Sequence, residues 1–202
     1  MRDFLLQIEK SLEADLYYLS LISCLTIPDI AGALDSRDGI VSRSRYSAWY
    51  DRWVRPQFPR LTYPGASKGF WMFMGKTESP LIGKECYRFR CSLLHQGSSQ
   101  YGAGNAAETP MEFLRVMLGI DNRRFQRIVF IEPGSTTLEL HYQVLGNALC
   151  IDLRRFCQEV LAGAREWLDQ AESTEPFQTN YQRFARRHPE GLLGISGVPV
   201  IG

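Results

Sequence analysis

The sequence predicts a mainly α-helical bundle with a small antiparallel β-hairpin or meander, formed by a single domain that spans residues 1–202. Apolar residues recur at helical spacing over 4–25, 79–96 and 152–172, which predicts three long amphipathic helices. Strand-like runs occupy the segment 127–151, between the second and third of these helices. Hydrophobic residues make up 45% of the chain and charged residues 22%, which is the balance of an ordinary globular protein.

The first predicted helix covers residues 4–25 as one continuous element. Its apolar stripe consists of Phe4, Leu5, Ile8, Leu12, Leu16, Leu19 and Ile22. Pro28 suits the first turn of a separate short helix, PDIAGAL, which ends at the turn sequence DSRDG. A further helix is expected to begin at a cap formed by Ser42 or Ser44 and to end before Pro56.

Residues 56–76 are rich in proline, glycine and aromatic side chains, and they predict an ordered loop whose rings cover the core. The second long helix, residues 79–96, accommodates Pro80 in its first turn. Gly97 is placed to end this helix in the left-handed conformation. The sequence GSSQYGAGNAAETP that follows predicts a flexible linker.

Three strand-like runs come next: RIVFIEP, TLELHYQV and ALCIDL, joined by the turn sequences GST and GN. They predict an antiparallel β element laid against the helices, because so small a sheet is not stable alone. The helix at 152–172 then presents an apolar side made of Leu153, Phe156, Val160, Leu161, Ala164, Trp167 and Leu168. The tail, about 177–202, is rich in glycine and proline near its end and predicts a flexible segment that covers the body or a partner subunit.

Composition excludes several classes of protein. The net charge of +1 provides no overall field that would draw the chain to nucleic acid or to membranes. The five cysteines form no C-x-x-C pair, which argues against zinc ribbons and disulfide frameworks and is typical of a reducing cytosol. Charged residues between Asp3 and Asp15 argue against a signal peptide. The sequence contains no run of eighteen apolar residues, so no membrane-spanning helix is expected. We therefore expect a cytoplasmic protein that needs no cofactor or metal.

The stretch CYRFRCSLLHQGSS, residues 86–99, carries the densest chemistry in the chain. Apolar residues of this helix account for a buried face, but they leave Arg90 and His95, in its last two turns, without a packing role. Five residues of an α-helix turn through about 140° net, so these two side chains are predicted to flank a groove. Cys91 and His95 are four residues apart and share a face.

Arg90, four intervening residues and His95, followed by QG at a helix end, resemble the signature of the HEPN superfamily of small helical proteins. The order of the three long helices is similar to that of a HEPN-like up-and-down bundle, and the resemblance covers these helices but not the aromatic loop or the strands. The family pattern allows four to six intervening residues. Arg88, with six, is therefore an alternative motif arginine.

The resemblance implies a homodimer in which Arg90 and His95 of two subunits surround one scissile phosphate of RNA, in a toxin–antitoxin or defence setting. A histidine can transfer protons near neutral pH and a guanidinium can hold phosphate oxygens, so the implied roles are acid/base for His95 and phosphate clamp for Arg90. Glu85 could orient Arg90 or face solvent, and Gln96 is a further supporting candidate. Active members often carry Asn or Asp after the arginine. Cys91 in that place is a poor hydrogen-bond donor, which puts catalysis in question.

Other interpretations stay open. Cys91 and His95 could act as a thiol nucleophile and its base. His141 is expected on the solvent side of a strand and His188 in a loop, and no two histidines have the spacing of metal ligands. A non-catalytic module that binds RNA or a cognate protein partner would use Arg90 and His95 only in internal pairs. A small-molecule site is also conceivable, built from Trp49, Trp53 and Trp71.

Overall fold

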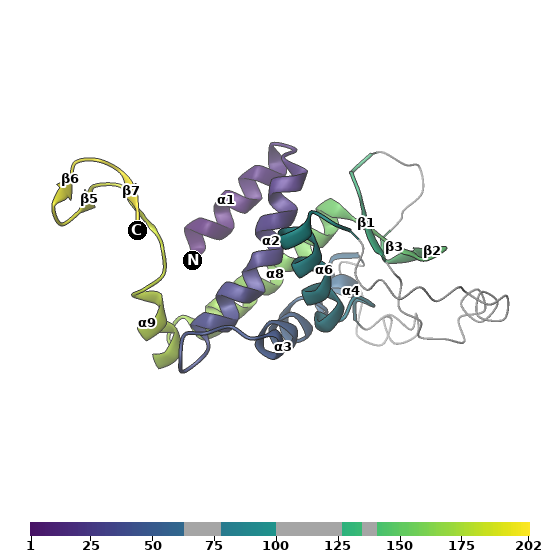
Figure 1. The fold of residues 1–202 in the computed structure, drawn as a ribbon, viewed down its shortest axis with the longest axis horizontal. Helices are drawn as coiled ribbons and strands as arrows, with labels where there is room; N and C mark the ends of the chain where they lie inside the picture. The colour runs from purple at the N-terminus through teal and green to yellow at the C-terminus, as the bar shows by residue number, and fades with distance from the viewer. Residues whose placement is uncertain (63–77, 100–126, 135–140) are drawn as a thin grey trace.

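The computed structural model describes residues 1–62, 78–99, 127–134 and 141–202 (Figure 1). The described chain is mainly helical and carries small β-sheets, as the sequence predicted. Its helices are α1 Arg2–Glu13, α2 Tyr17–Leu34, α3 Arg43–Trp53, α4 Gln57–Thr62, α6 Gly83–Gln96, α8 Leu153–Ala171 and α9 Glu175–Tyr181. Its strands are β1 Arg127–Ile131, β2 Gln143–Leu145, β3 Ala148–Asp152, β4 Arg187–His188, β5 Gly191–Leu192, β6 Ile195–Ser196 and β7 Val200–Ile201.

The first predicted helix, 4–25, is wrong as one continuous element, because the chain divides into α1 and α2. Asp15 adopts a left-handed backbone with φ 57°, a conformation that aspartate tolerates better than most residues. The backbone N–H of Leu16 donates to the carbonyl of Ser11 at 2.9 Å, which closes the end of α1. The apolar spacing runs on across this break, so the pattern alone concealed it.

The prediction of a separate short helix that begins at Pro28 is also wrong, because Pro28 lies buried inside α2. This helix packs against α1, α3, α6, α8 and α9, and these contacts outweigh the backbone hydrogen bond that proline cannot make. By length and composition α2 is the one helix of the described chain apolar enough to cross a membrane. Half of it is buried inside the structure, which is the environment of a core helix.

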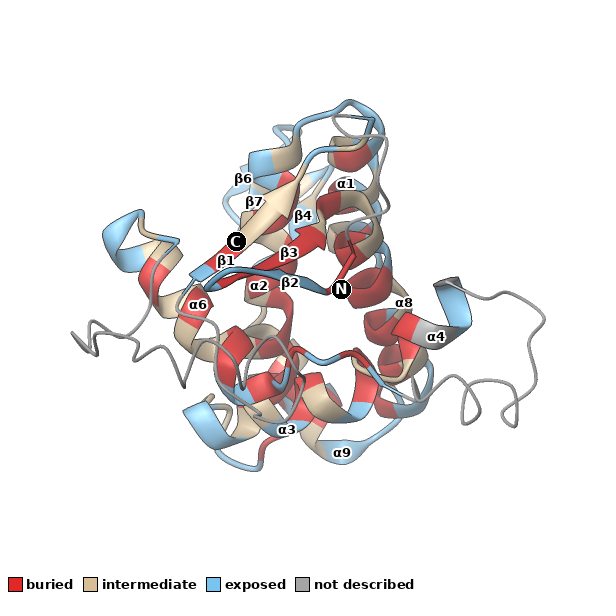
Figure 2. Cartoon of the chain, turned by 90° about the vertical axis from the view of Figure 1, so that its right-hand side faces the viewer, coloured by how far each residue is buried: buried red, intermediate tan, exposed pale blue. Residues whose placement is uncertain are grey.

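The core lies where α1, α2, α3, α6 and α8 pack together with β1 and β3, and Figure 2 shows buried residues in red on these helices and on β3. α8 coincides to within one residue at each end with the predicted helix 152–172, and its cap Asp152 accepts from the backbone N–H of Arg155 at 2.8 Å. Ser42 caps the start of α3, and its hydroxyl oxygen accepts from the backbone N–H of Arg45 at 3.3 Å. α6 starts four residues later than the predicted 79–96.

The β element is not the purely antiparallel hairpin or meander that the sequence predicted. Its strand order is β1-β3-β2, in which β3 pairs antiparallel with β2 but parallel with β1. Gly146, with φ 59°, provides the predicted tight turn between β2 and β3. β1 pairs with β3, although β2 comes between them in the sequence. The alternation of apolar residues in a strand does not indicate whether its neighbour will be the next strand or a later one.

Several predicted segments lie wholly or partly outside the described residues. The aromatic loop 56–76 is described only up to residue 62, where it forms α4, and most of the linker after Gly97 is not described. The tail predicted as flexible at 177–202 begins within α9 and then forms two sheets of two short strands each, β4 with β7 and β5 with β6. In Figure 1 the strands β5, β6 and β7 lie beyond α9, to one side of the helices.

Candidate functional site

The second half of α6 carries the predicted site residues. Cys86, Phe89 and Ser92 are buried and fix one face of the helix against the core. Gly97 ends the helix with φ 63°, in the left-handed conformation expected from its position. In the last two turns Arg90 is mostly buried beside this face, whereas His95 is exposed.

Arg90 forms an ion pair with a partner that the sequence did not reveal. Its Nη2 atom lies 2.7 Å from Oδ2 of Asp29, which projects from the middle of α2. The exposed fractions of the two side chains are 19% and 14%, so the pair is shielded from most of the solvent. Asp29 thereby anchors the guanidinium to the core helix.

Arg90 also contacts His95 directly. Its Nη1 atom lies 3.3 Å from Nε2 of His95 and 3.8 Å from the sulfur of Cys91. The angular separation of the two residues on the helix suggested a groove between them, but the long arginine side chain crosses it. An arginine has no acceptor atom, so this contact requires a neutral imidazole whose Nε2 accepts and whose proton resides on Nδ1.

Burial raises the pKa of Asp29 above its usual value of 3.8, although the charge of Arg90 and its contact with the carboxylate oppose that shift. Burial by itself lowers the pKa of Arg90, but Asp29 and Cys91 outweigh it, so the net shift is upward. Arg90 is consequently a permanent cation in this site, and its counter-ion is the group that titrates.

This arrangement predicts that Asp29 titrates above pH 3.8. Because the folded state holds this proton more tightly than an ordinary aspartate does, the ion pair to Arg90 is lost as the pH falls through that raised value. In Arg90→Met, which keeps most of the bulk, we expect a still higher midpoint, since the opposing cation is gone. The carboxyl carbon chemical shift of Asp29 followed against pH measures this. Arg88→Met is the matched control, and an equal rise in that variant contradicts the assignment.

The other predicted site residues lie nearby with different partners. Glu85 is buried, so the solvent-facing alternative is wrong, and its Oε2 atom lies 3.7 Å from Nη1 of Arg88. Cys91 is half-buried beside Arg90, and Gln96 is exposed at the helix end. The Nε2 atom of His95 and the sulfur of Cys91 both contact Nη1 of Arg90, and among the described residues no hydrogen bond joins His95 to Cys91 as a thiol nucleophile and base would require.

A second polar cluster was missed by the sequence. His141 is buried, which corrects its expected position on a solvent face, and its Nε2 atom lies 2.8 Å from Oε1 of Glu159 on α8. The hydroxyl of Tyr142 donates to Oε2 of the same carboxylate at 2.5 Å. Phe58 of α4 packs on both rings. The cluster anchors the β2–β3 hairpin to the helices.

The solvent-facing position expected for His141 assumed that it belongs to a strand. β2 begins only at Gln143, and Tyr142 has φ 56°, so the alternation of a strand does not extend to His141. The signal that could have found the cluster is Glu159 itself. It stands between Phe156 and Val160 on the apolar side of α8, where a carboxylate needs a buried partner.

Among the described residues, no group of three or more His, Cys, Asp or Glu side chains is placed to hold a metal ion. Comparison with protein-family models, with curated proteins and with solved structures gave no significant match.

Proposed function

We propose that this chain is a HEPN-like endoribonuclease that cleaves RNA without a metal ion. The observation that supports it is the contact of 3.3 Å between Nη1 of Arg90 and Nε2 of His95 at the end of α6. A fixed cation beside a group that can exchange a proton is the pair that phosphodiester transesterification requires. The up-and-down HEPN-like bundle is part of the same proposal.

In the proposed reaction, a ribose 2′-OH attacks the adjacent phosphorus while Nε2 of His95 accepts the hydroxyl proton. A phosphate oxygen takes the place of Nε2 as the acceptor for Arg90, which releases the imidazole lone pair for the proton. The bond from phosphorus to the 5′-oxygen breaks, and this oxygen receives a proton from an imidazolium. The products are a 2′,3′-cyclic phosphate and a 5′-hydroxyl.

Asp29 is a positioning residue in this mechanism. It binds Nη2 of Arg90, while Nη1 faces His95 and Cys91. The Nε–H group of Arg90 is buried and has no hydrogen-bond partner among the described residues, so Nη1 is the donor that this mechanism assigns to the phosphate. The sulfur of Cys91 accepts only weakly, which leaves Nη1 easy to transfer to a phosphate.

The proposal includes a homodimer, in which two such sites meet around one phosphate and His95 of the partner subunit supplies the second proton transfer. It places the protein in the cytoplasm, with RNA as substrate and a cognate protein partner in a toxin–antitoxin or defence setting. These elements come from the resemblance to the HEPN superfamily.

The alternative function is a non-catalytic HEPN-like module that binds RNA or a protein. The observation that favours it is the shielded pair of Arg90 and Asp29, because a guanidinium committed to an internal carboxylate has less charge to offer a phosphate. Under this alternative the same side chains stabilise the packing of α6 on α2.

The proposal is tested by incubating mixed cellular RNA and EDTA with the purified protein. We expect the wild type to cleave the RNA and both His95→Ala and Arg90→Ala to lose about a hundredfold of the rate, the usual contribution of a general acid–base group. Gel analysis of the RNA over time measures the rates.

The matched control is Lys84→Ala, which removes an exposed charge from the opposite end of the same helix and should cleave at the wild-type rate. Circular dichroism checks that every variant is folded. If the folded wild type does not cleave, or if the two site variants cleave as fast as Lys84→Ala, the ribonuclease proposal fails and the interaction module becomes the better account.

A further inference from the structure

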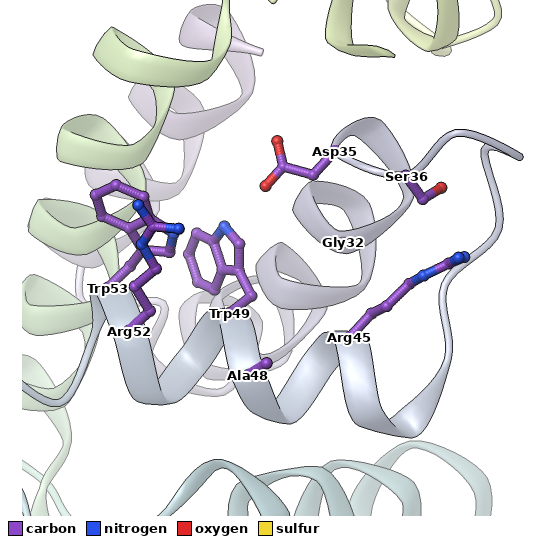
Figure 3. Close-up of a pocket in the computed structure, with 8 residues that line it drawn as sticks. All are labelled: Gly32, Asp35, Ser36, Arg45, Ala48, Trp49, Arg52 and Trp53. Atoms are coloured by element: carbon purple, nitrogen blue, oxygen red, sulfur yellow. The ribbon is translucent and has the colours of Figure 1, made fainter.

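A crevice with a volume of about 240 Å³ lies between the C-terminal end of α2 and the length of α3 (Figure 3). Its walls combine four aromatic or charged side chains of α3, namely Arg45, Trp49, Arg52 and Trp53, with Ala48 of the same helix and with Gly32, Asp35 and Ser36 at the end of α2. This volume is below the range typical of drug-sized ligands, so the crevice suits a smaller molecule.

Two opposite charges face this crevice without pairing. Asp35 receives a hydrogen bond of 2.8 Å from the indole N–H of Trp167, which fixes its carboxylate. Burial raises the pKa of Asp35 above 3.8, and the hydrogen bond from Trp167 and the charge of Arg52 partly oppose this shift. Arg52 is thus near enough to act on Asp35, yet no ion pair joins the two within the described part of the chain.

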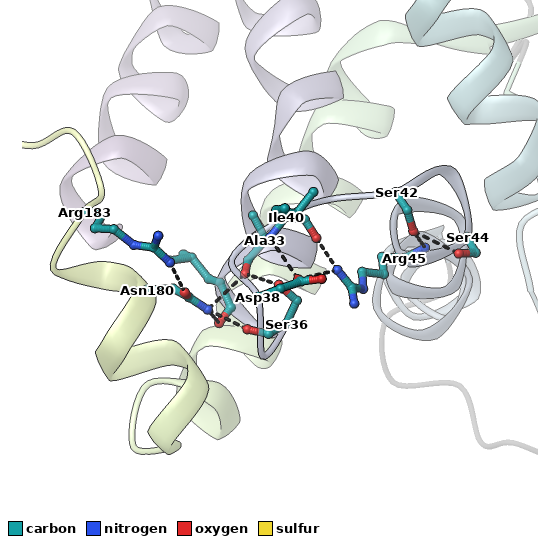
Figure 4. A network of polar contacts seen from close by, with 10 residues as sticks. Ala33, Ser36, Asp38, Ile40, Ser42, Ser44, Arg45, Asn180 and Arg183 are labelled. Carbon is teal, nitrogen blue, oxygen red and sulfur yellow. Dashed lines mark hydrogen bonds and ion pairs between the residues drawn. The ribbon is translucent and has the colours of Figure 1, made fainter.

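Arg52 is the arginine that is available at this site. Its guanidinium lies 4.6 Å from the centre of the Trp53 ring, a cation–π contact that holds the group but leaves its N–H donors open. Arg45, at the other end of the crevice, is already engaged, as Figure 4 shows. It forms an ion pair of 2.6 Å with Asp38 and lowers the pKa of that carboxyl to about 2.

The wall between the two charges contains an unused donor. Trp49 is 4% exposed, and its indole N–H has no hydrogen-bond partner among the described residues. Figure 3 shows this nitrogen on the side of the ring that faces Asp35 and Arg52. A buried donor without a partner is unfavourable, and an acceptor on a bound molecule would remove that cost.

We propose that this crevice binds a small zwitterion of the free amino-acid class, whose carboxylate contacts Arg52 and the indole N–H of Trp49 and whose ammonium group contacts Asp35. The parts of Trp49 and Trp53 that line the crevice provide an apolar wall for the side chain of the bound molecule. This site is separate from Arg90 and His95, and its occupancy is measured without any RNA cleavage.

The test uses L-phenylalanine as the probe on the full chain. Calorimetry is expected to give a dissociation constant below about 1 mM. Among the four indole N–H signals that the four tryptophans provide, that of Trp49 is expected to shift. Phenethylamine, which lacks the carboxylate, and 3-phenylpropionate, which lacks the ammonium group, should each bind at least about tenfold more weakly, because each loses a charge-assisted contact.

Variants on the lining connect the binding to the residues. Arg52→Ala and Asp35→Asn are each expected to weaken the binding of L-phenylalanine by about tenfold or more. The asparagine in Asp35→Asn keeps an acceptor oxygen for the indole N–H of Trp167. Arg43→Ala removes an exposed charge from the first turn of the same helix and should bind like the wild type. No binding at the millimolar level, equal binding of 3-phenylpropionate, or an equal loss in Arg43→Ala would each overturn the proposal.

Discussion

Replacement of Glu159 by alanine is expected to lower the free energy of unfolding by at least about 3 kcal/mol, the usual result of breaking a buried pair. The Glu159 side chain is fully buried and holds both His141 and Tyr142. Without the carboxylate, the hydroxyl of Tyr142 and Nε2 of His141 stay in the interior with no partner. The β2–β3 hairpin also loses its connection to α8.

Thermal unfolding measures this effect, and a loss of this size in a chain of this length lowers the melting temperature by about 6 to 12 °C. Gln158→Ala is the matched control, because Gln158 is the exposed neighbour on the same helix. A melting temperature for Glu159→Ala equal to that of Gln158→Ala would show that the cluster does not stabilise the fold.

Gly83→Ala is expected to lower the free energy of unfolding by about 3 kcal/mol, at the upper end for overpacking. A Cβ atom at Gly83 would lie 2.7 Å from the Cα atom of Ser47 and closer still to its carbonyl oxygen. The obstacle is backbone of α3, which cannot rotate away as a side chain can. α6 must then move off α3, and Arg90 moves with it relative to Asp29.

This prediction is checked by urea denaturation and by the Asp29 carboxyl titration in the same variant. The expected outcome is a lower unfolding midpoint together with a changed Asp29 midpoint, because the Arg90 guanidinium is displaced. Lys84→Ala, one residue along the helix and exposed, provides the comparison. If Gly83→Ala unfolds at the same urea concentration as Lys84→Ala, α6 does not depend on this close approach to α3.

The sequence pattern located the helices better than it located their breaks. α8 was evident because its apolar side repeats for five turns and Asp152 caps its start. The division between α1 and α2 was hidden, since it depends on one backbone conformation at Asp15, and Asp15 stands within an uninterrupted apolar stripe. The parallel pairing of β1 with β3 was equally hidden, because strand periodicity does not name a partner.

The candidate site was predictable in part. Arg90 and His95 were found by spacing on one helix, and the structure brings them into contact. Asp29 could not be found, because it lies 61 positions before Arg90 and reaches it only through the packing of α2 on α6. The facing charges of Asp35 and Arg52 escaped prediction for the same reason. They belong to different helices whose approach is decided by the core.

The most direct test of the account is the chemistry of the RNA ends that the purified wild-type protein produces in EDTA. Transesterification by Arg90 and His95 predicts 2′,3′-cyclic phosphate ends and 5′-hydroxyl ends, neither of which should form with His95→Ala. Ends that carry a 5′-phosphate and a 3′-hydroxyl would contradict the account, because they require attack by water rather than by the ribose hydroxyl. An absence of any cleavage by the folded wild type would contradict it equally.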